Sequence, residues 1–137
     1  MRFTFSYQGP YRRRSDEHLK RGMALHREGR IDESIHALAI ASRSPRHRFQ
    51  ASSLIGRICR ERDQLSDAIE WFERAAQAPA ATADDGYLLM YELADALEAA
   101  GEVSRALAVC MELQATAGQF RDVAARVDRL AKVQARG

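Results

Sequence analysis

Two arginines in the middle of the chain have the type and spacing that could hold a charged ligand. Arg57 and Arg60 are three residues apart, and residues at this spacing share one face of a helix. A guanidinium can hold a carboxylate through two parallel hydrogen bonds. Glu61 lies four residues from Arg57 and can neutralise only one of the two charges. The spacing therefore predicts a site for an acidic group of a partner.

Residue patterns typical of catalysis or metal binding are absent from the sequence. The histidines form no HExxH motif, and no cysteine or carboxylate stands at zinc-ligand spacing from them. Neither a GxxxxGK[ST] nor a GxGxxG phosphate loop occurs. Cys59 and Cys110 fall on apolar helix faces, which favours two core thiols over a disulfide. We therefore expect no enzyme activity, no cofactor and no bound metal.

Length and composition indicate one globular domain. The chain has 137 residues, of which 46% are hydrophobic and 29% charged, and this balance argues against disorder. No run of 18 apolar residues and no secretory-type apolar segment occurs. We therefore expect a cytoplasmic protein that has no membrane partner. The 19 arginines against two lysines are typical of a GC-rich, bacterial genome.

The charge is distributed unevenly along the chain. Residues 1–62 carry 14 basic and 6 acidic residues, a net charge of +8, whereas residues 63–137 carry 7 and 13, a net charge of −6. This asymmetry suits an acidic partner near the first half or head-to-tail self-association; the alternative is that the arginines only solvate helix faces. Nucleic-acid binding through the basic clusters is disfavoured, because the acidic second half would repel phosphates.

A helical pattern recurs along the chain with a period of 34 residues. Small, apolar and proline residues match at this offset. A third copy follows at an offset of 38, and we expect the loop 79–86 to absorb its four extra residues. The matched positions are Gly22 and Gly56, Ile31 and Leu65, Ile35 and Ile69, Leu38 and Phe72, Ala41 and Ala75, Pro45 and Pro79; in the third copy, Gly101, Val103, Ala106 and Cys110 match Asp63, Leu65, Ala68 and Phe72.

This 34-residue pattern resembles the tetratricopeptide repeat, although the early tryptophan of that family is missing. The resemblance covers roughly residues 15–118. It implies an all-α fold, a right-handed α-solenoid of three helix–turn–helix hairpins. We place the repeats at about 15–48, 49–82 and 87–118, with a C-terminal capping helix at 120–135. Residues 1–14 would form an extended or flexible basic and aromatic tail.

Capping and breaking residues predict where the helices begin and end. Ser15 can cap the first helix, and Asp84 and Asp85 suit the start of the fifth. A seventh helix is indicated by an apolar stripe that starts at Phe120. The expected ranges are 15–28, 31–43, 49–61, 65–77, about 84–100, 103–116 and 120–135.

The resemblance also implies that the first helix of each hairpin lines a concave groove. The carboxylate clamp of chaperone-binding members is not matched, because Leu19, Met23, Leu88 and Glu92 stand at its positions. The inward positions are Asp16, Leu19, Met23, His26, Arg27, Gln50, Ser53, Arg57, Arg60, Leu88, Tyr91, Asp95 and Glu98. From these we select Leu19, Met23, His26, Arg57, Arg60, Leu88, Tyr91 and Asp95 as the candidate partner-binding set.

Taken together, these patterns predict a non-enzymatic protein–protein interaction scaffold. The groove would bind a peptide or protein segment that carries an acidic residue flanked by apolar ones. Three alternatives stay open at this point. The surfaces could build a homo-oligomer, the basic half could bind nucleic acid, or the groove residues could face water and bind nothing.

Overall fold

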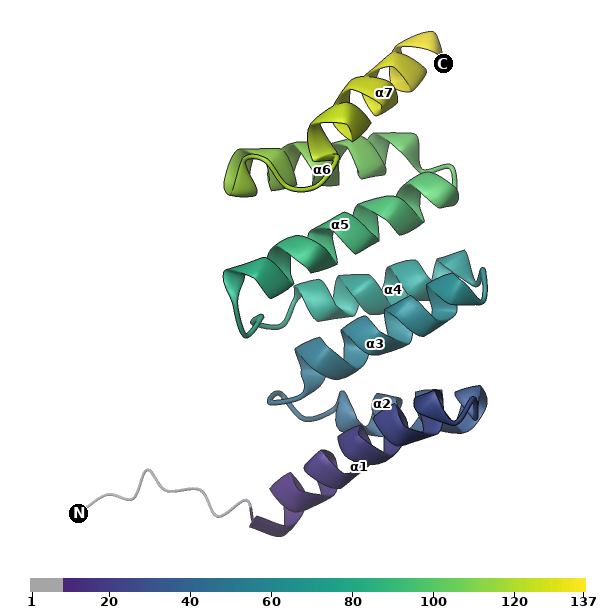
Figure 1. Cartoon of the computed structure of the whole chain (residues 1–137), viewed down its shortest axis with the longest axis vertical. Coiled ribbons are helices and arrows are strands. Elements are labelled where there is room, and N and C mark those ends of the chain that lie inside the picture. Colours follow the sequence, from purple (N-terminus) through teal and green to yellow (C-terminus); the bar gives the residue numbers. More distant parts are fainter. Residues whose placement is uncertain (1–8) are drawn as a thin grey trace, which may run out of the picture.

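The structure is a computed structural model that describes residues 9–137, with side chains described from Arg14 onward. It consists of helices stacked in chain order along one axis (Figure 1). Every ordered segment of this part of the chain is helix or turn, as predicted. The helices are α1 (Gly9–Arg27), α2 (Ile31–Ala41), α3 (Arg48–Glu61), α4 (Leu65–Ala76), α5 (Ala83–Ala99), α6 (Val103–Ala117) and α7 (Val123–Arg136).

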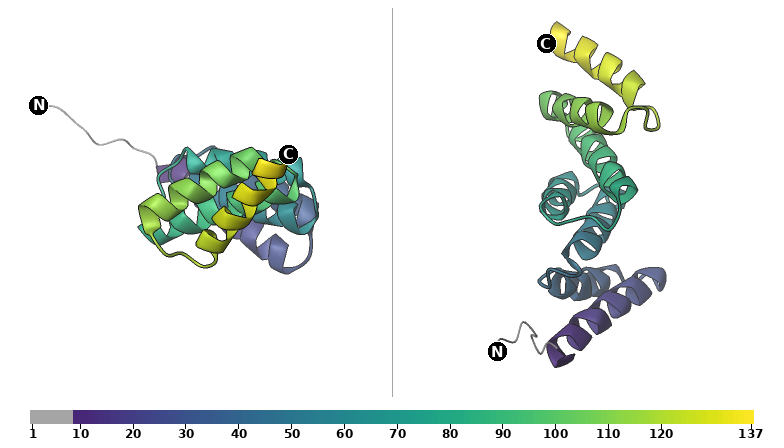
Figure 2. Two further views of the ribbon diagram at one scale, coloured as in Figure 1. Left: turned by 90° about the horizontal axis from the view of Figure 1, so that it is seen from above. Right: turned by 90° about the vertical axis from the view of Figure 1, so that its left-hand side faces the viewer.

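The helices pair into three hairpins, α1–α2, α3–α4 and α5–α6, and α7 packs on α6. The side view shows a long, narrow stack with α1 at one end and α7 at the other (Figure 2, right). Each hairpin touches mainly its neighbours in the sequence, which is the property that defines a solenoid. The predicted all-α solenoid is therefore confirmed.

The first helix begins at Gly9, six residues before the predicted start at Ser15. Residues 9–14 were predicted to belong to the N-terminal tail, but Pro10 is compatible with the first turn of a helix, where no backbone N–H is needed. Ser15 accordingly lies inside α1 and is buried instead of capping it. The aromatic alternation of Phe3, Phe5 and Tyr7 lies outside the described residues.

The three hairpin turns share one backbone geometry. Each places its turn residue at positive φ, with values of 80° for Gly29, 59° for Asp63 and 81° for Gly101. This left-handed conformation at the end of a helix is usually adopted by glycine, so Asp63 is the exception. In each turn the next residue donates its N–H five residues back, over 2.8–2.9 Å: Arg30 to Leu25, Gln64 to Cys59, and Glu102 to Leu97.

Glycine allows the two helices of the first and second hairpins to touch. A Cβ added to Gly56 would lie 2.6 Å from the Phe72 ring carbons Cδ1 and Cε1. A Cβ added to Gly22 would lie 2.6 Å from Cγ of Leu38. Both distances are shorter than any relaxed carbon contact, so neither position has room for a side chain. The repeated glycine is thus explained by helix–helix approach.

In the third hairpin a different pair of residues lies at the contact between the two helices. Ala94 stands where the first two hairpins have glycine, and Cys110 stands where they have leucine and phenylalanine. Both side chains are 1% exposed. Burial raises the pKa of Cys110 and of Cys59, which keeps both as neutral thiols. The prediction that these cysteines are core residues is confirmed.

The seventh helix exists, but it begins at Val123, three residues later than predicted. Val123 and Leu130 are its buried residues. The face of α7 that a further helix would cover carries Ala124, Asp128 and Ala131, which are all exposed. Because these side chains are small or charged, this face needs no apolar cover. This composition supports the predicted capping role.

We expect Gly56→Leu to be strongly destabilising. Overpacking a tight core typically costs about 1–3 kcal/mol, and here the obstruction is an entire buried ring, Phe72. The matched control is Gly86→Ala, since a Cβ at Gly86 meets only Ala80, at an ordinary 3.7 Å. Replacing an unhindered helical glycine by alanine should stabilise by roughly 1 kcal/mol. Urea denaturation measures both; a Gly56→Leu protein as stable as the parent would show that the assigned repeat register is wrong.

Candidate partner-binding site

The two arginines of the concave face are already paired inside the molecule. Nε of Arg57 lies 3.0 and 2.8 Å from the two carboxylate oxygens of Glu92. Nε of Arg60 lies 3.1 Å from Oδ2 of Asp95. Both arginines stand on α3 and both carboxylates on α5. The expectation that Arg57 and Arg60 lack partners is therefore wrong, and they do not offer two free charges to an acidic ligand.

The pairing extends from α5 to α7. Arg126 of α7 reaches Asp95 at 3.3 Å and Glu98 at 3.4 Å, and Arg129 reaches Glu98 at 2.6 Å. Burial by itself would lower the pKa of Arg126, but Tyr91 and the nearby carboxylates raise it overall. We call this set the arginine–carboxylate ladder: Arg57, Arg60, Glu92, Asp95, Glu98, Arg126 and Arg129.

A small hollow of about 210 Å³ lies at the α3–α5 step of this ladder. Two arginines and three carboxylates line it, together with the edge of Phe72. An acidic partner residue here would meet Glu61 and would have to displace Glu92 or Asp95 from their arginines. Exchanging one carboxylate for another on the same arginine gains little free energy. The ladder therefore serves to hold successive repeats together and is poorly suited to binding an acidic ligand.

Several other predicted groove residues belong to the core. Leu19 is only 8% exposed and is part of the central apolar cluster. Met23 is half-buried against this cluster. His26 and Leu88 are also half-buried, and they remain reachable from solvent. The structure therefore does not bring the eight predicted residues together as one open apolar and cationic groove.

Two further inward positions are occupied by internal contacts. Asp16 is hydrogen-bonded through Oδ1 to Nε2 of His47, a contact that joins α1 to the start of α3. Ser53 is 2% exposed and lies within α3. Ser53 therefore cannot contact a ligand without a local rearrangement, whereas Asp16 is partly exposed but already bonded to His47.

Tyr91 fastens the segment that leads into α7. Its hydroxyl donates to Oδ1 of Asp122 over 2.5 Å, and its ring lies 6.0 Å from the ring of Phe120. The guanidinium carbon of Arg126 lies 4.7 Å from the same ring. Burial and the bond to Asp122 raise the pKa of Tyr91, and the bond from Tyr91 lowers the pKa of Asp122. The side chain of Tyr91 is therefore mainly engaged in contacts within the molecule.

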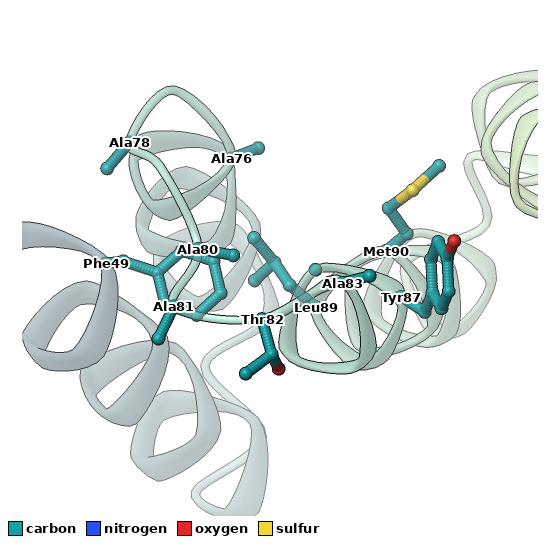
Figure 3. A pocket seen from close by; sticks show the side chains of 11 residues that line it. Phe49, Ala76, Ala78, Ala80, Ala81, Thr82, Ala83, Tyr87, Leu89 and Met90 are labelled. Carbon is teal, nitrogen blue, oxygen red and sulfur yellow. The ribbon is translucent and has the colours of Figure 1, made fainter. Parts of the chain in front are cut away.

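A hollow with a different lining lies between α3, α4 and the start of α5. Its volume is about 480 Å³, and most of the side chains that line it are apolar (Figure 3). We call it the alanine-lined hollow. It is lined by Phe49, Ala76, Ala78, Ala80, Ala81, Thr82, Ala83, Gly86, Tyr87, Leu89 and Met90.

One wall of this hollow is an additional helical turn. The extra residues of the third repeat were expected in the loop 79–86, but α5 begins at Ala83, so that they lengthen the helix instead. The N-cap is Thr82, whose hydroxyl accepts a hydrogen bond from the N–H of Asp85 over 3.1 Å. Asp84 and Asp85 alone predicted the start of this helix, and the N-cap role of Thr82 was not predicted. Nothing in the sequence pattern indicated that the residues before this helix line a hollow.

A family model described as tetratricopeptide repeat matches residues 19–84. Residues 19–84 therefore form tetratricopeptide repeats. The match runs from α1 to the first turn of α5, so it includes the first two hairpins and much of the alanine-lined hollow. Repeats of this family generally mediate protein–protein interaction. A search of curated proteins finds no match to the chain.

The described residues offer little evidence for other kinds of site. Between residues 9 and 137, no helix is both long and apolar enough to cross a membrane. Among the side chains described, no three histidine, cysteine or carboxylate groups stand close enough together to hold a metal ion.

The ladder predicts a charge-reversal effect between α3 and α5. Arg57→Glu should destabilise the protein because it places a carboxylate against Glu92. The double variant Arg57→Glu, Glu92→Arg should recover most of the loss, with a coupling of about 0.2–1 kcal/mol for this partly exposed pair. Urea denaturation of the four proteins gives the coupling. Additive effects would mean that the pair contributes nothing to stability.

Tyr91→Phe should lower stability by about 0.5–1.5 kcal/mol at neutral pH, since it removes one hydrogen bond and keeps the ring. The bond needs an ionised Asp122, whose pKa is lowered in the folded state. That contribution is complete above the unfolded pKa near 4 and is lost as the pH falls through the folded value. Melting temperatures of parent and variant should therefore converge below about pH 4. A constant difference down to pH 2 would contradict this assignment.

Proposed function

We propose that this protein is an interaction module that binds a segment of another protein by taking an apolar side chain into the alanine-lined hollow. The observation that carries the proposal is the hollow itself, about 480 Å³ in volume with a predominantly apolar lining. Binding pockets of about 300–1,000 Å³ are typically apolar with a few polar groups. The general role of tetratricopeptide repeats in protein–protein interaction agrees with it.

The wall of the hollow suits a large, flexible or aromatic anchor. Phe49 and Tyr87 offer ring surfaces from two successive repeats, and Met90 offers an adaptable thioether. Figure 3 shows Tyr87 and Met90 to one side of the hollow and Phe49 toward the other. Full burial of a leucine, methionine or phenylalanine side chain contributes roughly 1.5–3 kcal/mol. One anchor is therefore enough for weak binding, and contacts around it add to it.

Charge near the hollow indicates the flanking residue of the partner. The added turn of α5 carries Asp84 and Asp85, both exposed, and no basic residue lines the hollow. A lysine or arginine beside the anchor would be attracted to these carboxylates. This reverses the sign expected from Arg57 and Arg60, whose charges are used inside the ladder.

The test fills the hollow without disturbing the fold. Gly86 lines it, and a Cβ there approaches only Ala80, another lining residue. Gly86→Leu should therefore project into the hollow and, by replacing a helical glycine, leave the melting temperature equal or higher. Gly86→Ala is the matched control, since it gives the same backbone effect and leaves most of the space open.

The ligand for this test comes from selection of a displayed random-peptide library on the parent protein. We expect enriched peptides with a large apolar residue next to lysine or arginine. Their affinity, measured by fluorescence anisotropy, should fall about tenfold or more in Gly86→Leu and stay unchanged in Gly86→Ala. Equal binding by Gly86→Leu, or no enriched peptide, would overturn the proposal. Light scattering shows whether a second copy of the chain occupies the hollow instead.

A further inference from the structure

A different kind of hollow lies in the first hairpin, α1–α2, the hairpin farthest from α7 in the stack (Figure 1). Its volume is about 220 Å³. Three lining residues come from α1, and three come from the end of α2 and the turn that follows it. We call it the basic hollow, lined by Arg14, Ser15, His18, Ile40, Arg43 and Ser44.

The arginines of the basic hollow have no acidic partner. Within the described part of the chain, no carboxylate lies within 4.0 Å of Arg14 or Arg43. Residues 1–13 contain neither aspartate nor glutamate, so they cannot supply one. By contrast, Arg57, Arg60 and Arg126 are all engaged in the ladder. The arginines of the basic hollow thus keep their positive charge unneutralised, whereas the arginines of the ladder are neutralised by carboxylates.

Two buried hydroxyl groups add hydrogen-bonding capacity. Ser15 is 7% and Ser44 9% exposed, although both line the hollow. Oγ of Ser15 is buried and has no hydrogen-bond partner in the described structure. Ser52 and Ser53 of α3 are also buried without a partner, but Ser15 lines a hollow that holds two arginines, so a ligand seated there would supply its missing bond.

The electrostatic surroundings also permit an anion. The carbonyl groups at the carboxyl end of α2 would by themselves repel an anion. Arg48 offsets their negative partial charge, because it donates hydrogen bonds to the carbonyl oxygens of Ser42 at 3.2 Å and Arg43 at 3.0 Å. On α1, Asp16 is bonded to His47, and Glu17 is exposed and does not line the hollow. On α2, Asp32 and Glu33 lie roughly 10–12 Å from Ile40 along the helix and line a neighbouring hollow. Both are held by other arginines, Asp32 by Arg62 and Glu33 by Arg30.

We propose that the basic hollow binds a phosphomonoester group. Two guanidinium groups, an imidazole and two hydroxyl groups match an anion with three strong acceptor oxygens and nearly two negative charges. A carboxylate would leave part of this charge and several of these donors unused. This inference is independent of the alanine-lined hollow.

The rest of the ligand has space beside the phosphate. A second hollow of about 390 Å³ adjoins the basic hollow and shares His18 and Ile40 with it. Its inner wall includes Leu25 and Ala37, which suits an apolar or planar body attached to the phosphate. Among the described lining residues of both hollows there is no phenylalanine, tyrosine or tryptophan on which successive bases could stack. A single phosphomonoester therefore fits better than a nucleic-acid strand.

The experiment titrates the full chain with inorganic phosphate, using chloride at matched ionic strength as the reference, and follows backbone amide resonances by NMR. We expect saturable shifts at residues 14–18 and 40–44. The double variant Arg14→Gln, Arg43→Gln should bind about tenfold or more weakly. Both arginines are exposed and unpaired, so folding should be unchanged.

The matched control is Lys20→Gln, Arg27→Gln. These residues are also exposed and unpaired cations of α1, they lie outside both hollows, and their replacement changes the net charge equally. Its phosphate affinity should equal that of the parent. An equal loss in the two double variants, or no saturable shift, would overturn the proposal because binding would reflect general surface charge or not exist.

Further ligands identify the source of the phosphomonoester. A phosphoserine peptide and its unphosphorylated form test a modified protein partner, and adenosine monophosphate tests a free metabolite. Either one binding more tightly than inorganic phosphate, with the same loss in Arg14→Gln, Arg43→Gln, supports the site. A single-stranded oligonucleotide that binds best and loses affinity equally in both double variants would overturn it in favour of nonspecific nucleic-acid binding.

Discussion

The whole stack depends on how closely the two helices of each hairpin approach. At Gly22 and Gly56 there is no room for even one more carbon atom, because the leucine or phenylalanine of the facing helix fills that space. The third hairpin reaches comparable burial with alanine against cysteine. This contact fixes the spacing within each hairpin, and the turn at positive φ fixes its direction. A solenoid then follows, since each hairpin can bury its remaining apolar face only against the next one.

The arginine–carboxylate ladder is the polar counterpart of this packing. It joins α3 to α5 and α5 to α7 along the inner face, where the first helices of successive repeats meet. Each pair is partly exposed and individually weak, but the pairs share Asp95 and Glu98 and therefore act as a network. On the face formed by α3, α5 and α7, the arginines and carboxylates are therefore paired with one another and are not free to bind a ligand.

The two hollows that we propose as binding sites lie outside this ladder. The additional turn of α5 opens a wall of alanine side chains beside Phe49 and Tyr87. In the first hairpin, no carboxylate of the described residues lies within 4.0 Å of Arg14 or Arg43. One hollow is apolar and the other cationic, so they suit two chemically different ligands.

The sequence by itself determined the helical hairpins, their period, the glycine contacts, the turns and the buried cysteines. All of these follow from spacing within about one repeat, which sequence periodicity reports directly. Only the tertiary structure decided what Arg57 and Arg60 do, because Glu92 and Asp95 lie 35 residues away and meet them only when the hairpins stack. The start of α1 at Gly9 also lay beyond prediction, since proline and glycine are compatible with either a loop or a first helical turn. Local spacing fixes which residues share a helix face, whereas the packing of that face against its neighbours decides whether its charges remain free to bind.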